Sequence, residues 1–304
     1  MQNPNLNQTD INPAHDGCDI DVIPIDSIDN PLLDPYRDLR NTKTSPLEDW
    51  FIAEGKLVVQ RLLQSDYRIR SVLLSRKQTN TFVRQIPAGV KVLSVDHRLC
   101  SQLVGFDFHA GIMACAIRKP ADEQQISRWP AQALLVCCPE TSLPDNLGSI
   151  LRLAASFSAQ GVITGPRSVD PFSRRCVRVS MGNIFGLDIF QPENLPAFLL
   201  DLKKRYGFEI VAGERIPEAE SLENFVPRRR MVFMLGNEAH GLGREWLDLS
   251  DRAVQIEMSP DVDSLNVSTA AAIILYRIRQ RLDQMHGRNP NEFFSSTEIP
   301  NRVE

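Results

Sequence analysis

The most regular hydrophobic pattern in the chain is the stretch DSLNVSTAAAIILYRIRQ (263–280). Its apolar residues recur at intervals of three and four, the spacing of one buried helix face. They are Val267, Ala270, Ala271, Ile274 and Ile278. The pattern predicts a long helix that starts near residue 264. Either Ser264 or Asn266 can cap this helix, because both side chains accept hydrogen bonds from the free N–H groups of a first turn.

Other apolar runs predict two α/β units. The first begins with a predicted helix in LEDWFIAEGKLVVQRLLQS, whose apolar side carries Phe51, Leu57, Val58 and Leu62. Its predicted strands are 69–75, 90–96 and 111–118. The predicted strands of the second unit are 133–138, 161–165, 209–214, 231–235 and 253–258. Because strands alternate with helices, we expect an α/β fold with a mixed or parallel sheet in the first unit and a parallel sheet in the second.

Polar segments set the predicted domain boundaries. KPADEQQISRWPAQ (119–132) contains two prolines and no apolar period, and it is interpreted as a linker. It separates a small α/β domain at 37–118 from a larger domain at 133–286. Residues 1–36 are predicted to be an acidic disordered tail, and residues 287–304 a C-terminal tail.

Composition narrows the functional classes. No run of 18 or more apolar residues occurs, and the N-terminal stretch lacks the basic and apolar regions of a secretory signal. We therefore expect no membrane association. The six cysteines form no C-x-x-C pair and no metal-ligand spacing, which favours a reducing cytoplasm and predicts no metal site.

The net charge of −4 averages two different regions. Residues 1–36 carry seven Asp and no Lys or Arg, whereas the basic residues that follow are clustered. The clusters are Arg37/Arg40/Lys43, Arg167/Arg174/Arg175/Arg178, Lys203/Lys204/Arg205 and Arg228/Arg229/Arg230. Such clusters suit a phosphate-rich partner, although ordinary solvated surfaces also carry them.

Three polar clusters follow predicted strands of the second unit, at the strand ends where parallel sheets bind ligands. The first lies in PETSLPDNLGSILRLAASFSAQG (139–161). Asn146 stands where a helix is predicted to begin, and Arg152 interrupts the apolar pattern of that helix. This arginine either extends into solvent or meets an anion in a site.

The second cluster, MLGNEAHGLG (234–243), has three glycines, which permit tight turns and close approach of backbone to a ligand. It has neither the Gly-Lys-Ser/Thr of a phosphate loop nor G-x-G-x-x-G. Glu238 would repel phosphate there, but it could orient a hydroxyl or fix a helix N-terminus. His240 is a candidate acid or base, although a lone loop histidine is more often plain surface. The third cluster is Ser264-Leu265-Asn266.

In identity, spacing and order, these clusters resemble the three signature motifs of the SpoU (TrmH-like) branch of the SPOUT RNA methyltransferases. The matching segments are Asn146-x5-Arg152, Leu235-Gly-Asn-Glu-Ala-x-Gly-Leu242 and Ser264-Leu-Asn-Val-Ser-x-Ala-Ala271. FIAEGKLVVQRLL also resembles the start of a small N-terminal domain, similar to a ribosomal RNA-binding protein, that many members carry. VRVSMGNIF resembles the segment that commonly follows the first motif.

The resemblance implies transfer of a methyl group from S-adenosylmethionine to a ribose 2′-hydroxyl of RNA. It also implies a homodimer and a C-terminal trefoil knot. The cofactor would be held largely by backbone groups, at positions that match Leu235, Gly236, Ile256, Met258 and Leu265.

The resemblance assigns the catalytic site to Arg152, Asn146, Glu238, Ser264 and Asn266. Arg152 would hold the phosphate and ribose of the target, while Asn146 and Glu238 would orient it, often across a dimer interface. Because arginine stays protonated in proteins, we expect Arg152 to lower the pKa of the hydroxyl and water or phosphate to take the proton. The chain departs from the family at Ser158, where many members have Gly, and at Glu257, where many have Pro.

The RNA remains open at this point. The small N-terminal domain favours a guanosine of ribosomal RNA, and a tRNA 2′-O-ribose methyltransferase is the alternative. A non-catalytic RNA-binding or ribosome-assembly protein of the same fold is a further reading, but the intact polar motifs argue against it. A Rossmann-type nucleotide enzyme would need a glycine fingerprint after the first strand, and the sequence has none.

Overall fold

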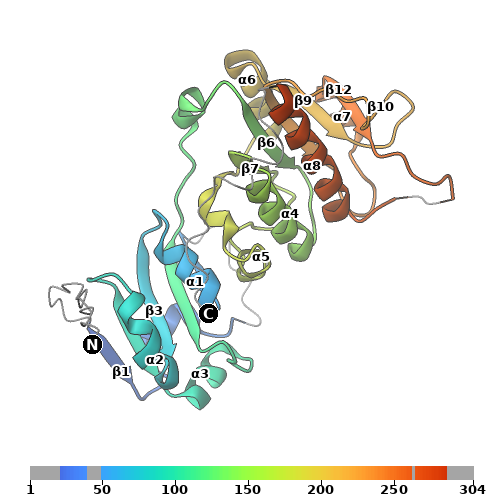
Figure 1. Cartoon of the computed structure of the whole chain (residues 1–304). Helices are drawn as coiled ribbons and strands as arrows, with labels where there is room; N and C mark the ends of the chain where they lie inside the picture. The colour runs from blue at the N-terminus through green and yellow to red at the C-terminus, as the bar shows by residue number, and fades with distance from the viewer. Residues whose placement is uncertain (1–20, 40–48, 262–263, 286–304) are drawn as a thin grey trace, which may run out of the picture.

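The computed structural model describes residues 21–39, 49–261 and 264–285, which form two α/β units (Figure 1). The first unit contains a five-stranded sheet in the order β1-β4-β3-β5-β2. Its strands are β1 (Val22–Ile25), β2 (Trp50–Glu54), β3 (Ile69–Ser75), β4 (Lys91–Val95) and β5 (Ile112–Ile117). β4 pairs in parallel with β1 and β3, whereas β5 is antiparallel to β2 and β3, so the sheet is mixed as expected.

The helices of the first unit connect these strands. They are η1 (Pro31–Tyr36), α1 (Lys56–Leu63), α2 (Arg76–Phe82), η2 (Val83–Gln85) and α3 (His97–Val104). The helix predicted from Leu47 is wrong in its first half, because β2 occupies that stretch and α1 begins only at Lys56. Gly55, with φ 99°, separates the two elements. A short run that is buried throughout a sheet has no period of its own to distinguish it from a buried helix.

The predicted acidic tail is wrong for residues 22–36. β1 pairs with β4, and η1 buries Leu33 and Tyr36 completely. The Tyr36 hydroxyl also lies 3.0 Å from the carbonyl oxygen of Ser71, to which it donates. The first unit therefore begins near Val22 and not at residue 37. Residues 1–20, the tail at 287–304 and the cations Arg40 and Lys43 lie outside the described residues.

The second unit contains a seven-stranded sheet, all parallel, in the order β10-β12-β9-β11-β6-β7-β8. Its strands are β6 (Ala133–Cys138), β7 (Gly161–Thr164), β8 (Asp188–Phe190), β9 (Glu209–Gly213), β10 (Glu220–Ser221), β11 (Arg230–Leu235) and β12 (Arg252–Gln255). The helices and 3-10 turns are η3 (Glu123–Arg128), α4 (Pro144–Ser156), α5 (Arg174–Val179), η4 (Asn183–Gly186), α6 (Leu195–Tyr206), α7 (Arg244–Leu249) and α8 (Val267–Met285).

Helices cover both faces of this parallel sheet. Alternate residues of β6 point to opposite cores: Leu134 and Val136 pack with residues of α4 and α8, whereas Ala133 and Leu135 pack with residues of α6 and α7. Strands buried on both faces read as continuous apolar runs, which is why the sequence identified them. The α/β fold with a parallel sheet is confirmed, and the trefoil knot stays a prediction.

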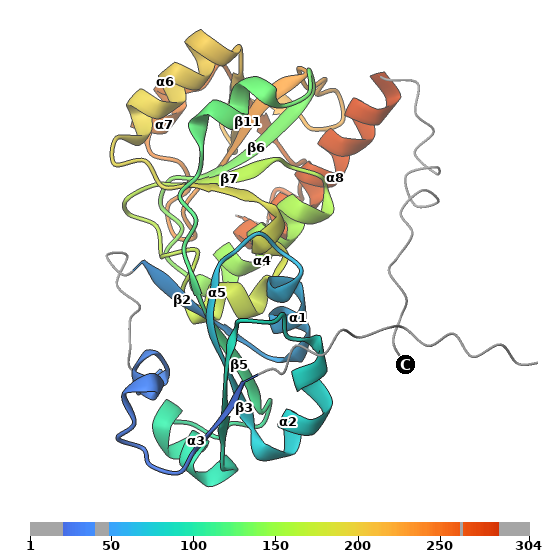
Figure 2. The same ribbon diagram turned by 90° about the vertical axis from the view of Figure 1, so that its left-hand side faces the viewer.

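The two units lie against each other (Figure 2), and they share a hydrophobic core. The rings of Phe51 and Tyr67 in the first unit pack against those of Phe172 and Phe185 in the second. The Phe51 and Phe172 ring centroids lie 5.2 Å apart. The segment predicted as a linker is itself packed, because Ile126 in η3 is fully buried. In the described part of the chain, no helix is long and apolar enough to cross a membrane.

Candidate active site

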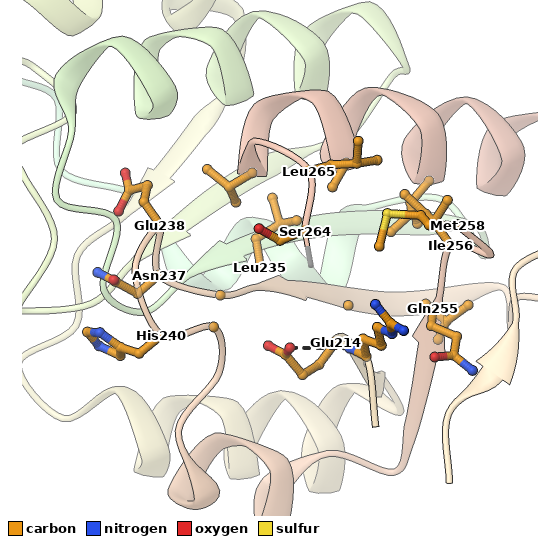
Figure 3. A pocket seen from close by; sticks show the side chains of 18 of the residues that line it. Glu214, Leu235, Asn237, Glu238, His240, Gln255, Ile256, Met258, Ser264 and Leu265 are labelled. Carbon is orange, nitrogen blue, oxygen red and sulfur yellow. Dashed lines mark hydrogen bonds between the residues drawn. The ribbon is translucent and has the colours of Figure 1, made fainter. Parts of the chain in front are cut away.

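A cleft of about 310 Å³ opens beyond the carboxyl ends of β9, β11 and β12 (Figure 3). Its walls come from the ends of these strands, from the loop 236–241 and from the start of α8. Neighbouring strands of a parallel sheet present their carboxyl ends at one edge, so this is the position expected for a ligand site. The volume lies at the lower end of the range for small-molecule sites.

The cleft brings together most of the residues that the sequence singled out. The five predicted cofactor positions all line it: Leu235, Gly236, Ile256, Met258 and Leu265. Glu238 and Ser264 line it as well. In Figure 3, Ile256 and Met258 lie on one side of the cleft, and Asn237, Glu238 and His240 lie on the other.

The loop 236–241 has a tight shape that requires glycine at two positions. Asn237 and Gly241 exchange both backbone hydrogen bonds, with N–O distances of 2.9 and 3.0 Å. A Cβ at Gly236 would lie 2.6 Å from the carbonyl carbon of Gly241. Gly241 itself has φ +67°, and a Cβ there would lie 2.4 Å from the Glu214 carboxylate. The second motif thus keeps its glycines for close backbone packing.

Glu214, directly after β9, fixes the end of this loop by a hydrogen bond to the adjacent backbone. Its carboxylate accepts hydrogen bonds from the backbone N–H groups of Leu242 (2.6 Å) and Arg215 (3.2 Å), and it lines the cleft. Glu214 was not singled out from the sequence. The available signal was its position as the last residue of the predicted strand 209–214, at the ligand-binding edge of the sheet.

Glu238 is the centre of a hydrogen-bond network. One carboxylate oxygen accepts from the Ser142 N–H and hydroxyl, at 3.1 and 2.9 Å. The other accepts from the Leu143 N–H and the Asn146 side-chain amide, both at 3.0 Å. Burial by itself would raise the pKa of Glu238, but these donors together hold the pKa below its ordinary value. The carboxylate is therefore ionised and its acceptor positions are occupied.

Asn146 connects this network to the third motif. Its side chain is 7% exposed, and its Oδ1 accepts from the Asn266 side-chain amide at 3.1 Å. The Asn266 Oδ1 in turn accepts from the backbone N–H of Ser268 (2.9 Å), so Asn266 caps α8. Of the two predicted caps, Asn266 has the role. One chain of hydrogen bonds thus links residues of all three motifs.

Arg152 stands apart from this arrangement. It is exposed on α4, does not line the cleft, and its guanidinium makes no hydrogen bond or ion pair with any residue that the structure describes. Within one chain, Asn146 and Glu238 hydrogen-bond with other groups and do not orient Arg152. His240 is also exposed, and its Nε2 lies 3.7 Å from a carboxylate oxygen of Glu140.

The predicted basic clusters are largely ion-paired, which weakens the argument from charge. The pairs are Arg167 with Glu140 and Glu245, Arg174 and Arg178 with Glu54, Arg175 with Asp145, Lys203 with Asp251, Arg205 with Asp201, and Arg228 with Glu209. Among the described residues, no group of His, Cys, Asp and Glu could hold a metal ion.

Comparisons with known proteins, by sequence and by structure, point to one family. The family described as SpoU rRNA Methylase matches residues 133–276. An uncharacterized tRNA/rRNA methyltransferase of Mycobacterium tuberculosis is 33% identical over 269 residues, which cover 84% of this chain and 91% of the relative. A 23S rRNA (guanosine(2553)-2′-O)-methyltransferase of Bacillus subtilis is 24% identical, covering 84% and 98%. The crystal structure of an AdoMet-bound rRNA methyltransferase from Sinorhizobium meliloti superimposes with a TM-score of 0.74 and 25% identity, covering 86% and 98%.

Proposed function

This chain belongs to the SpoU rRNA methylase family, and from this membership we propose that it methylates the ribose 2′-hydroxyl of a guanosine in ribosomal RNA. It is an RNA methyltransferase whose cofactor is S-adenosylmethionine. The names of the relatives support ribosomal RNA and guanosine. The observation that carries the proposal is the joining of three motifs, by hydrogen bonds through Glu238, Asn146 and Asn266, beside one cleft.

The cleft suits S-adenosylmethionine. Apolar side chains of Leu235, Ile256 and Leu265 stand beside the backbone of the loop 236–241, where a Cβ at Gly236 would not fit. Such a site offers apolar contacts to the adenosine, and backbone N–H and C=O groups to its polar atoms. When bound, the sulfonium supplies an electrophilic methyl group. The chain's own residues must then hold the 2′-oxygen in line and help it lose its proton.

Glu238 serves this reaction by position and not as the base. A general base needs a pKa near the working pH and a free lone pair, whereas the pKa of Glu238 is lowered and four donors occupy its oxygens. We assign Glu238 and Asn146 to fixing the start of α4 against the cleft loop. Water or a phosphate oxygen of the RNA would accept the proton.

Arg152 would complete the site from a second copy of the chain. Its free guanidinium suits the phosphate and ribose of the target nucleotide, but it lies outside the cleft of its own chain. Large apolar side chains are exposed nearby: Leu143 just before α4 is 51% exposed, and Tyr276 on α8 is 57% exposed. α4 and α8 pack against each other, so this face suits a homodimer contact.

The test uses purified protein, labelled S-adenosylmethionine, and unmodified rRNA and tRNA, with the product identified by mass spectrometry. Label in a 2′-O-methyl guanosine of rRNA is the expected result. An rRNA substrate would favour the cytoplasm, where ribosomes are found, as the place of the reaction. Label only in tRNA would replace the substrate. Absence of both label and cofactor binding would favour a non-catalytic RNA-binding protein.

A further inference from the structure

A second cleft, of about 690 Å³, lies between the two units and shares no residue with the candidate active site. One wall is α1 of the first unit, with Arg61 and Gln64. The other wall belongs to the second unit and includes Ser158, Asn183 and Asp188. We call it the interunit groove. Its lining is more polar than that of the cofactor cleft, and both units are needed to form it.

Two non-glycine residues with positive φ occur here: Ser158 lines the groove, and Met181 directly precedes the lining residue Gly182. Ser158 (φ 58°) follows the end of α4, where Ala159 N–H donates to the Ala154 carbonyl at 2.9 Å. Glycine usually fills such a left-handed position at a helix end, because a side chain there is strained. Met181 (φ 55°) is held by its carbonyl, which accepts from Arg61 at 2.7 Å. Strained residues of this kind concentrate at functional sites.

The strain at Ser158 places a hydroxyl in the groove wall. This hydroxyl has no hydrogen-bond partner in the part of the chain that the structure describes, and neither has the side-chain amide of Gln64, which is exposed. The Asn183 amide nitrogen donates to the Ser180 carbonyl at 2.8 Å, which leaves its oxygen available. The groove thus presents unpaired donors and acceptors from both units.

These groups match the edge of a nucleic-acid base better than its backbone. Amides and hydroxyls offer both donors and acceptors, as base edges do, and unpaired bases are the usual target of sequence-specific RNA recognition. Asp188, the carboxylate in the wall, accepts from base amino groups but repels phosphate. One N–H group of Arg61 donates to the Met181 carbonyl, and the remaining N–H groups of its guanidinium can donate to a phosphate.

We propose that the interunit groove binds one unpaired nucleotide of the RNA substrate, with its base edge against Gln64 and Ser158. The inference rests on the proposed function, because the ligand is the RNA that is methylated. Arg152 lies on α4, and Ser158 follows the C-cap residue of the same helix, six residues farther along the chain. A strand held in the groove is therefore anchored to the helix that carries the predicted catalytic arginine.

Ser158→Gly and Gln64→Ala test the proposal. If Ser158 had only a structural role, glycine would relieve the strained backbone and would not weaken RNA binding. Glycine relieves the strained backbone, so the melting temperature should stay equal or rise by about 2–4 °C. The affinity for 23S rRNA transcribed in vitro should fall about three- to tenfold for each variant, and at least tenfold for the double variant, at fixed salt. S-adenosylmethionine affinity should not change. Gln102→Ala on α3, an exposed glutamine outside the groove, is the matched control.

The outcomes separate the groove from the proposed function. A double variant that binds and methylates rRNA like the wild type overturns the groove proposal alone. Wild-type protein that binds rRNA without transferring methyl groups overturns the proposed function. In that case the rRNA affinities of the single and double variants still test the groove. A parallel loss of cofactor affinity, or a change of oligomeric state in the variants, also counts against a nucleotide site.

Discussion

Glu238 shows how a single carboxylate can organise a site without taking part in proton transfer. It lies in the cleft loop, yet its donors come from the segment that leads into α4, so it ties the second motif to the first. Hydrogen bonds to a charged acceptor are stronger than those between neutral groups. The same donors favour the ionised form, which is why the pKa of Glu238 lies below its ordinary value although burial would raise it.

Glu238→Gln should weaken this contact by about 1–2 kcal/mol, since the amide cannot accept from every donor. A carboxyl group whose pKa is lowered on folding stabilises the folded state above its unfolded pKa of about 4.3, and the stabilisation is lost as the pH falls through the folded pKa. The difference in melting temperature between wild type and variant should therefore shrink below about pH 4. A difference that stays constant from neutral to acid pH would contradict this role.

Arg152→Ala should abolish methyl transfer while leaving S-adenosylmethionine affinity within about twofold, because Arg152 does not line the cleft. Calorimetric titration with the cofactor and a transfer assay on rRNA measure the two effects. Arg244→Ala removes another exposed arginine, which pairs with Asp248 on α7, and should change neither. Full turnover by the Arg152 variant would remove this residue from the mechanism.

At the scale of elements, the cleft depends on close contact between the end of β9 and the loop after β11. Gly236→Ala should weaken S-adenosylmethionine binding roughly 10- to 100-fold, because the new Cβ would meet the Gly241 backbone at 2.6 Å and force the loop to move. Gly243→Ala is the matched control, since the nearest atom to its Cβ is the Trp246 ring at 3.9 Å. Equal affinities for the two variants would show that the loop tolerates the shift.

The sequence predicted the elements of the second unit well and those of the first less well, for a physical reason. Parallel strands buried on both faces, such as β6 and β11, are continuous apolar runs. β1 is short and lies among aspartates and prolines, and only pairing with β4 makes it a strand. The composition of this segment therefore indicated disorder, although its tertiary contacts make it an ordered strand.

The site shows the same division. Asn146, Glu238 and Asn266 were predicted from motif order, and the fold joins them by hydrogen bonds. The contact of Glu214 with Leu242 spans two segments that sequence patterns cannot bring together. The left-handed backbone at Ser158 would suit glycine, the residue that the family resemblance predicts there, and only the dihedral angle reveals this preference.

At the scale of the whole molecule, the two units are joined by more than a linker. The Arg118 guanidinium, at the end of β5, makes two hydrogen bonds to the Asp170 carboxylate, at 2.9 and 2.6 Å, and both side chains are nearly buried. Glu54 at the end of β2 pairs with Arg174 of α5. Together with the aromatic rings of Phe51 and Phe172, these contacts fix the first unit relative to the candidate active site in the second.

Asp170→Asn tests whether this fixed arrangement serves the reaction. Removing one partner of a buried ion pair leaves Arg118 as an uncompensated charge, which should destabilise the protein by about 3–5 kcal/mol. Because the loss falls on the contact between the units, thermal unfolding should separate into two transitions where the wild type shows one, since its units share a core. Methylation of intact rRNA should fall while cofactor affinity stays, because the cleft lies outside this contact.

Asp248→Asn, which breaks the exposed pair with Arg244, should leave all three measurements unchanged. A single transition with unchanged methylation in Asp170→Asn would show that this ion pair is not needed to hold the two units together for the reaction.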